Sequence, residues 1–157
     1  LTTTERTVGY AASAAVGGLL AGATVVVVFL PFIVLAPAHP LALIFFAVAG
    51  ATMHGLMGAV AGLWARRWDH YTAAVMFFVI PLNFLSGAFW SIDALPDLAR
   101  PFVAFNPVFH IINGVRYGFT GVSEGSLAVG VLVVLAANAA LAVLLHRLLQ
   151  SGWRVKS

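Results

Sequence analysis

The chain holds few side chains that could act as a nucleophile or bind a metal. Its 157 residues include no cysteine and a single lysine, Lys156. Disulfides, thiolate metal sites and a cysteine nucleophile are therefore excluded. A phosphate-binding loop of the form GxxxxGK[ST] is absent, and so is the HExxH sequence of helical zinc sites. The sequence predicts no catalytic residue and no metal site in this chain.

An intramembrane hydrolase built on Ser86 is an alternative that the residues leave open. Ser86 and Gly87 lie outside any GxSxG sequence, and His54 or His110 would have to act as the base. No acidic pair lies within the apolar stretches, which disfavours a proton-coupled carrier. If the protein performs work, we expect the energy source in another chain.

The composition is that of a membrane protein. Hydrophobic residues make up 62% of the chain and charged residues only 8%, whereas a soluble domain carries about 25% charged residues. The net charge of +3 would suggest nucleic acid in a soluble protein. Here the basic residues are spread among apolar stretches, so they indicate topology, and no nucleic acid partner is expected.

Four uncharged runs are each long enough to cross a bilayer, which needs about 20 apolar residues. The second run contains His54, the third contains Pro81 and Asn83, and the fourth contains Asn138. We therefore predict an all-α integral membrane protein with four transmembrane helices. The predicted spans are residues 8–35, 41–65, 71–90 and 126–145.

Basic residues predict the orientation of these spans. Loops on the cytoplasmic side of a membrane protein carry an excess of Lys and Arg. With both termini of the chain in the cytoplasm, six basic residues lie inside and two lie outside. The inside set is Arg6, Arg66, Arg67, Arg147, Arg154 and Lys156, and the outside set is Arg100 and Arg116.

The segment between the third and fourth spans, residues 91–121, is predicted to form a short amphipathic helical hairpin on the outer face. Ser91 and Asp93 can cap a first short helix. Pro101 should end or kink that helix. Because non-helical backbone at membrane depth must be shielded from lipid, we expect the hairpin to pack over the spans or to dip between them.

A second helix of this hairpin is predicted to begin at Asn106, a capping residue followed by Pro107. Gly118 and Gly121 should break it before the last span. Two sets of side chains recur at helical spacing on different sides. The apolar set is Val108, Ile111, Ile112, Val115 and Phe119, and the polar set is His110, Asn113 and Arg116.

Two GxxxG sequences mark helix faces where backbones could approach closely. They are Gly18 with Gly22, and Gly58 with Gly62. Ordinary contacts within the chain would explain both. A structural membrane protein that assembles a larger complex through these faces is a second alternative function.

Residues 81–121, PLNFLSGAFWSIDALPDLARPFVAFNPVFHIINGVRYGFTG, resemble the C-terminal signature of ABC-2-type transporter permeases. The RYGFTG ending is more similar to the multidrug-type branch than to the polysaccharide-export branch, and GYAASAAVGGLLAG resembles the family's third span. The matching positions are Pro81, Phe84, Leu85, Ser86, Gly87, Leu95, Pro96, Asn106, Pro107, Gly114, Arg116, Tyr117 and Gly118.

This resemblance implies a permease dimer that works with two ATP-binding cassette subunits, which would bind ATP and Mg. It implies export of an amphipathic or hydrophobic solute (a drug, a lipid or a glycan-like molecule) by alternating access across a bacterial plasma membrane. Family members have six spans after an interfacial helix. The four spans here correspond to the last four, so the chain is interpreted as a fragment of a longer permease.

The resemblance also suggests roles for particular residues. The short loop of Arg66, Arg67, Trp68 and Asp69 is a candidate contact with the ATPase, although these residues could equally anchor the chain at the headgroups. Polar and aromatic residues at membrane depth are candidates for the translocation path. They are His54, Asn83, Phe84, Phe89, Trp90 and Asn138.

The path candidates have alternative explanations. The polar ones could serve interhelical hydrogen bonds, and the aromatic ones could fill helix interfaces. Candidate residues of the outer hairpin, expected to act as a lid, are Asp93, Asp97, Asn106, Pro107, His110, Asn113, Arg116 and Tyr117. Within this lid Arg116 could pair with Asp93, Asp97 or Glu124, or it could be solvated.

Overall fold

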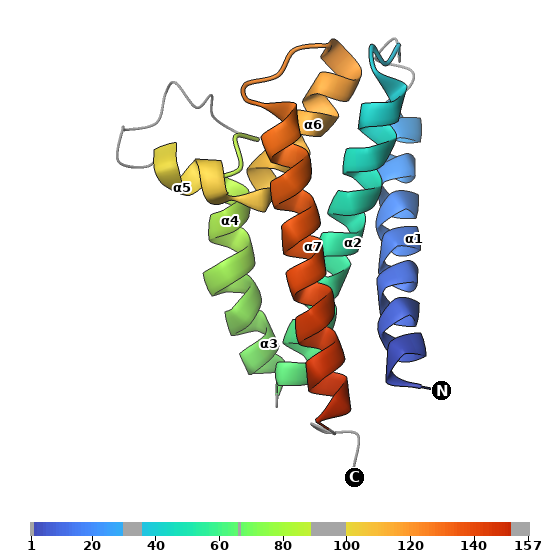
Figure 1. Ribbon diagram of the computed structural model, residues 1–157, viewed down its shortest axis with the longest axis vertical. Coiled ribbons are helices and arrows are strands. Elements are labelled where there is room, and N and C mark those ends of the chain that lie inside the picture. The colour runs from blue at the N-terminus through green and yellow to red at the C-terminus, as the bar shows by residue number, and fades with distance from the viewer. Residues whose placement is uncertain (1, 30–35, 66, 89–99, 152–157) are drawn as a thin grey trace.

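A computed structural model describes residues 2–29, 36–65, 67–88 and 100–151. Over these ranges the secondary structure is helical, with no strand. The helices run roughly side by side along the long axis (Figure 1). One end of the bundle, called the terminal end here, holds the start of α1 and the ends of α2 and α7. The opposite end, called the hairpin end, holds the start of α2, the end of α6 and the start of α7. The predicted all-α membrane architecture is confirmed.

Three helices are long and apolar enough to cross a membrane: α1 (Thr3–Phe29), α2 (Pro40–Trp64) and α7 (Leu127–Gln150). They correspond to the first, second and fourth predicted spans. The boundaries of α2 differ from the prediction by one residue. Helix α1 begins five residues earlier than predicted, and α7 ends five residues later. These extra turns carry charged residues, because helical hydrogen bonding continues where the hydrophobic run stops.

The third predicted span is not a regular α-helix. It consists of α3 (Trp68–Ala74), the π-helix η1 (Val75–Val79) and α4 (Ile80–Phe84), which follow one another without interruption. A π-turn makes i→i+5 hydrogen bonds and is commonly found at functional positions. The backbone amide of Ile80 donates to the carbonyl of Val75 in this manner. The predicted extent of this span is too long, since the helix ends at Phe84 and a turn follows at residues 85–87. Phe89 and Trp90 lie outside the described residues.

The hairpin contributes α5 (Arg100–Phe105) and α6 (Pro107–Thr120). Helix α6 begins as predicted: Pro107 occupies its first turn, and the side chain of Asn106 accepts a hydrogen bond from the amide of Val108. Pro101 lies in the first turn of α5, which begins at Arg100 and continues to Phe105. The helix that Pro101 was predicted to end or kink would lie in residues 91–99, outside the described residues. A proline in a first turn gives up an amide hydrogen that has no helical partner there.

Helix α6 does not lie flat over the spans. It runs alongside the upper part of α2 and α7 and ends at the hairpin end (Figure 1). Of the two arrangements expected for the hairpin, the structure shows the one that dips between the spans. Gly121, with a φ of 75°, ends the helix in the left-handed conformation that glycine adopts readily. Gly118 was predicted to break the helix as well, but it lies within α6.

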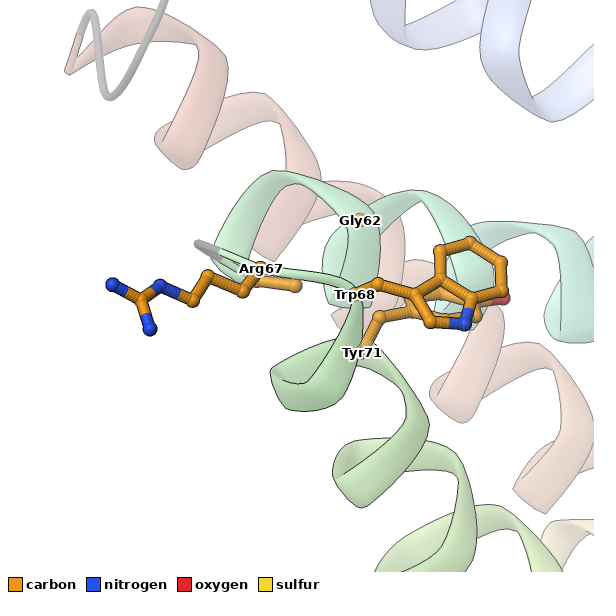
Figure 2. A pocket seen from close by; sticks show the side chains of 5 residues that line it. Gly62, Arg67, Trp68 and Tyr71 are labelled. Carbon is orange, nitrogen blue, oxygen red and sulfur yellow. The ribbon is translucent and has the colours of Figure 1, made fainter.

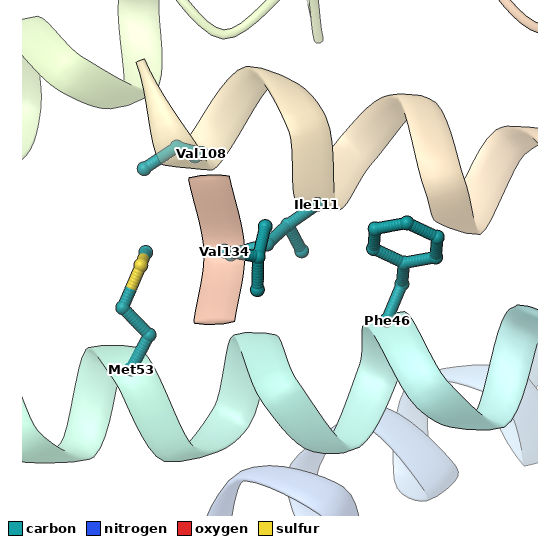
Figure 3. Close-up of a cluster of buried hydrophobic side chains, with 5 residues drawn as sticks. All are labelled: Phe46, Met53, Val108, Ile111 and Val134. Carbon is teal, nitrogen blue, oxygen red and sulfur yellow. The ribbon is translucent and has the colours of Figure 1, made fainter. Parts of the chain in front are cut away.

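The main hydrophobic cluster joins α2, α6 and α7. Figure 3 shows its five buried side chains: Phe46 and Met53 from α2, Val108 and Ile111 from α6, and Val134 from α7. Ile112 and Val115 pack against the cluster from α6. The predicted apolar side of α6 is therefore the side that faces the core.

A second cluster lies nearer the terminal end, where Leu56 of α2 packs with Leu145 and Leu149 of α7 and with Ala11 of α1. A polar chain supports it. The hydroxyl of Thr7 donates to the carbonyl of Thr3, so the Nδ1–H of His146 donates to Thr7 Oγ1 at 3.3 Å. The start of α1 is thereby held beside the end of α7.

Glycines allow the closest helix contacts. A Cβ built on Gly118 would lie 2.6 Å from Leu43 Cβ, and one on Gly114 would lie 2.1 Å from the Phe46 ring. Similar conflicts arise between Gly55 and Ala14 and between Gly18 and Ala51. Helix α2 therefore receives α1 on one side and α6 on another.

The prediction from the GxxxG sequences is only partly correct. Gly18 makes a close contact within the chain, with Ala51. A Cβ on Gly22, Gly58 or Gly62 would meet no described atom within 4 Å. Other close contacts involve Gly114 and Gly118 of α6, which also have the GxxxG spacing but were not singled out from the sequence, and Gly55 of α2, which does not. The crossing points of the helices decide which of these small residues is needed.

Candidate functional site

The junction between α4 and α6 is built around one buried amide. Asn106 is 3% exposed. Its Oδ1 accepts from the amide of Val108 at 3.0 Å, and its Nδ2 donates to the carbonyls of Leu82 at 2.7 Å and Leu85 at 3.2 Å. Its own backbone amide donates to the carbonyl of Val103 in α5 at 3.0 Å. One residue thus connects three helices.

The chemistry of helix ends explains this arrangement. The last carbonyls of α4 and the first amides of α6 have no partners within their own helices. In a hydrocarbon environment each unsatisfied group costs several kcal/mol. An asparagine side chain offers an acceptor and two donor hydrogens. Asn106 therefore satisfies groups of both helix ends. A carboxylate in its place would donate to neither carbonyl, and a hydroxyl could donate to one at most.

Ser86 lies beside this junction and is fully buried. Its hydroxyl donates to the carbonyl of Asn83. His110 donates through Nε2 to the carbonyl of Ala104 at 2.8 Å, and His54 donates through Nδ1 to the carbonyl of Gly50 at 2.9 Å. The serine–histidine pairing that a hydrolase would need is therefore not formed with either histidine.

A second connection ties α6 to the chain after α4. Arg116 donates through NH2 to the carbonyl of Gly87 at 2.8 Å, and through NH1 it pairs with Glu124 at 2.5 Å. The Oδ1 of Asn113 accepts from the backbone amide of Glu124 at 2.7 Å. Of the partners suggested for Arg116, the structure selects Glu124; Asp93 and Asp97 lie outside the described residues.

The end of α6 is also bonded to the segment before α2. The backbone amide of His39 donates to the carbonyl of Gly118 at 2.9 Å, and the amide of Ala38 donates to Phe119 at 3.3 Å. The rings of His39 and Tyr117 stack with centroids 4.3 Å apart and planes 5° from parallel. Tyr117, a predicted lid residue, therefore holds the start of α2 to α6.

His110 and Asn113 were expected on a polar outer side of the hairpin, but both are buried, at 5% and 2% exposed. The Nε2 of His110 is used as a donor, so Nδ1 is an acceptor, and it has no partner among the described residues. A Cβ on Gly130 of α7 would lie 3.3 Å from that Nδ1. His110 therefore packs against α7 where the small residue leaves room for its ring.

The polar candidates at membrane depth behave differently from one another. Asn83 donates to Val79 and His54 to Gly50, each within its own helix. Only Asn138 bonds across helices: its Nδ2 donates to the carbonyl of Ala49 in α2 at 3.2 Å, and also to Val134 in its own helix. The interhelical explanation therefore applies to Asn138 alone among the three.

The turn between α2 and α3 forms a shallow pocket of about 360 Å³ at the terminal end. Its lining residues are Gly62, Ala65, Arg67, Trp68 and Tyr71. In Figure 2 the rings of Trp68 and Tyr71 point the same way and the Arg67 guanidinium points the other way. The two rings lie 5.5 Å apart. This turn presents an exposed cation beside an exposed tryptophan that lies near a half-buried tyrosine.

The structure brings some predicted site residues together and leaves others apart. Asn83 and Asn106 both belong to the α4–α6 junction, where Asn106 bonds the carbonyls of Leu82 and Leu85 on either side of Asn83. Arg67, Trp68 and Asp69 lie in the α2–α3 turn. Phe84 is exposed at the end of α4. The predicted site residues outside the described ranges are Arg66, Phe89, Trp90, Asp93 and Asp97.

Sequence reasoning missed the bonding partners at the α4–α6 junction. The carbonyls of Leu82 and Leu85 carry no side-chain signal. The signal available was Pro81 followed by Gly87, which places a helix end at membrane depth, where carbonyls need donors. A buried asparagine later in the chain was the residue type to search for. The close-contact glycines Gly50 and Gly130 were also missed.

Comparison with known proteins adds a family match. A family model described as "ABC-2 type transporter" matches residues 1–120, from α1 to the end of α6. The chain is 32% identical over 131 residues to the "Inner membrane transport permease YadH" of Escherichia coli strain K12, and identical figures hold for the protein of that name from Shigella flexneri.

Each of these alignments covers 80% of this chain and 50% of the relative. The chain thus spans about half the length of the relatives it matches. No solved structure matches the chain significantly. The described helices are therefore interpreted from their own contacts.

Proposed function

The chain belongs to the ABC-2 type transporter family, and on that premise we propose that it forms part of the membrane permease of an ATP-driven exporter. The observation that carries the proposal is the family match over residues 1–120, which includes the α4–α6 junction and the α2–α3 turn. Hydrolysis of ATP, with its Mg, takes place in a separate ATP-binding cassette subunit. This chain contributes helices that move and no catalytic group.

The proposed cargo is an amphipathic or hydrophobic solute, such as a drug, a lipid or a glycan-like molecule, carried outward by alternating access. Support comes from the RYGFTG ending of α6 and from the apolar character of the helix faces. His54, Asn83 and Phe84 are the described candidates for the path, with Phe89 and Trp90 as further candidates by sequence. For Asn138 the bond to α2 favours a role in packing.

The proposed location is the inner membrane of a bacterium, as the names of the relatives state for those proteins. Both ends of this chain lie in the cytoplasm. The support is the distribution of basic residues: Arg6, Arg67 and Arg147 belong to turns at the terminal end, whereas Arg116 lies near the hairpin end.

Two partners complete the proposed assembly. A second permease copy would pack against the apolar faces of this one, and the open sides of Gly58 and Gly62 leave room for a close helix contact there. The ATPase would contact the α2–α3 turn through Arg66, Arg67, Trp68 and Asp69. Trp68 is 78% exposed and available for such a contact.

The test is to co-express the full reading frame with the neighbouring ATP-binding cassette protein and to assay ATP hydrolysis of the purified complex in lipid nanodiscs. We expect a stable complex whose hydrolysis depends on the permease. Arg67→Gln should lower it several-fold. Arg147→Gln is the matched control, because it removes a basic residue at the same end but outside the α2–α3 turn. Failure of any such ATPase to co-purify would contradict the proposal.

A further inference from the structure

We propose that Asn106 is a positioning residue that fastens the end of α4 to the start of α6, so that these two helices move as one unit and bending of the α3–η1–α4 segment falls on η1. The inference deepens the proposed transport function and rests on it for the motion. The fastening itself is a property of the chain alone. Neither the sequence nor the family match assigns such a role to Asn106.

The first support is the number of separate bonds at the joint. Asn106 bridges Leu82 and Leu85 on one side and Val108 on the other. Arg116, nearly three turns further along α6, bonds the carbonyl of Gly87. The end of α4 and the residues after it are therefore held to α6 at two levels, which resists both sliding and rotation.

The second support is the anchoring of α6 itself. Gly114 and Gly118 place its backbone directly against α2, and His110 packs against Gly130 of α7. The backbone amide of His39 closes its last turn. A unit held by backbone contacts on two sides cannot bend easily, so α4 inherits the rigidity of α6 through Asn106.

The third support is the contrast with η1. Outside the segment, α3 has a few contacts with α2 and α4 has a few with α6, whereas the contacts of η1 above that level are with α3 and α4 themselves. Three of its five side chains face outward: Met76, Phe77 and Phe78 are 58%, 77% and 70% exposed. A π-turn makes i→i+5 hydrogen bonds and is wider than an α-turn. Because the hydrogen bonds of Asn106 and Arg116 hold the α4 end, bending of the segment meets the least resistance at η1 and moves α3 relative to the other helices.

The test measures two distances by electron paramagnetic resonance in the complete transporter in nanodiscs. A joint pair of spin labels is placed at Leu85→Cys and Phe105→Cys, and a hinge pair at Ala73→Cys in α3 and Leu144→Cys in α7. All four positions are exposed, and these 157 residues contain no competing cysteine. In the otherwise unmodified protein we expect ATP with vanadate to shift the hinge pair and to leave the joint pair unchanged.

Asn106→Asp is the informative variant. It keeps the oxygen that accepts from Val108 and removes the nitrogen that donates to Leu82 and Leu85. Without nucleotide, we expect a broader distribution of the distance between the two labels of the joint pair. When ATP with vanadate is added, the distance change of the hinge pair should become smaller and a distance change should appear in the joint pair. A loss of stability alone would not produce this exchange. Asn106→Ser, which also caps helices but lacks the nitrogen, serves if the aspartate variant does not accumulate.

The matched control is Asn113→Asp. It makes the same chemical change at an equally buried position of α6 whose oxygen bonds Glu124 rather than α4. It should leave the joint pair narrow. The proposal is overturned if the distance distribution of the joint pair stays narrow in Asn106→Asp. It is also overturned if that distance changes with nucleotide in the otherwise unmodified protein. If no ATPase associates, the proposed transport function fails, and the comparison of the two variants without nucleotide still decides whether the joint exists.

Discussion

At the scale of single residues, the side chain that is missing matters as much as the one that is present. Gly118 lets α6 approach the backbone of α2, where the Cα and N atoms of Leu43 cannot withdraw. Gly22 of α1 has nothing described within 4 Å of the place where its Cβ would be. The same residue type therefore has opposite sensitivity at two positions.

Replacing Gly118 by alanine should destabilise the protein by about 1–3 kcal/mol, the usual cost of overpacking a close contact. Gly22→Ala is the control and should be neutral or stabilising by up to about 1 kcal/mol, because alanine favours the helix over glycine. Thermal unfolding in lipid nanodiscs measures both. Equal melting temperatures for the two variants would show that the α2–α6 contact is looser than described.

Asn138 tests whether a polar residue at membrane depth serves packing or transport. Asn138→Leu removes the bond to the carbonyl of Ala49. Interhelical hydrogen bonds in membranes contribute about 0.6 kcal/mol on average, so we expect a small loss of stability. ATP-dependent uptake of the dye Hoechst 33342 into inverted vesicles should be retained. Uptake lost at unchanged stability would place Asn138 in the path instead.

At the scale of secondary structure elements, the important feature of the α3–η1–α4 segment is its π-helical turn. The run VMFFV forms a π-turn between two α-helical pieces. The extra residue in this turn presents Phe77 and Phe78 outward and gives the helix a wider, less regular step. The consequence is a segment whose α4 end is held to α6 and whose middle can bend.

Deleting Phe77 should convert η1 into regular α-helix while α3 and α4 remain. Circular dichroism and melting temperature should change little, because Phe77 is exposed and makes no core contact. ATP hydrolysis coupled to dye uptake should fall several-fold, since the stiffened segment bends less. Phe102→Ala, which removes an exposed phenylalanine from α5, is the control and should keep activity. Full uptake after the deletion would contradict a mechanical role for η1.

The elements that sequence reasoning predicted well are those governed by local rules. Asn106 and Pro107 predict a helix start, and Gly121 predicts an end, because each affects the helix through its own residue and its near neighbours in the chain. The elements predicted poorly depend on distant partners. The neighbouring helix decides whether Gly118 ends a helix or allows a close helix contact. It also decides whether His110 faces water or α7.

The candidate site follows the same division. Arg67 and Trp68 could be placed at a membrane boundary from the hydrophobic runs on either side. The bridging by Asn106 could not, since its partners are main-chain carbonyls of residues 82 and 85, more than 20 positions away. Such partners leave no trace in residue type.

At the scale of the whole molecule, both ends of the described chain lie at one end of the bundle (Figure 1). Basic residues gather there, in the first turns of α1, the α2–α3 turn and the last turns of α7. From the positive-inside rule we expect that end in the cytoplasm. The proposed contact with the ATPase and the joint at Asn106 fall at opposite ends of the α3–η1–α4 segment.

A labelling experiment checks this orientation. Ser123→Cys, at the hairpin end, should react with a membrane-impermeant maleimide in intact cells. Gln150→Cys, at the end of α7, should react only after the membrane is permeabilised. Both side chains are exposed, so accessibility to the reagent depends on the side of the membrane alone. The reverse pattern of labelling would invert the orientation.

The position of Asn106 in the chain has a consequence for biogenesis. Because α4 is synthesised before Asn106, the carbonyls of Leu82 and Leu85 lack this hydrogen-bond donor until Asn106 has been made. Helix α6 in turn lacks the packing surface that α7 provides until α7 has been inserted. A chain arrested before Asn106 would leave the carbonyls of Leu82 and Leu85 in the lipid without this donor. The joint that positions α4 in the finished protein therefore forms only after the start of α6 has been made.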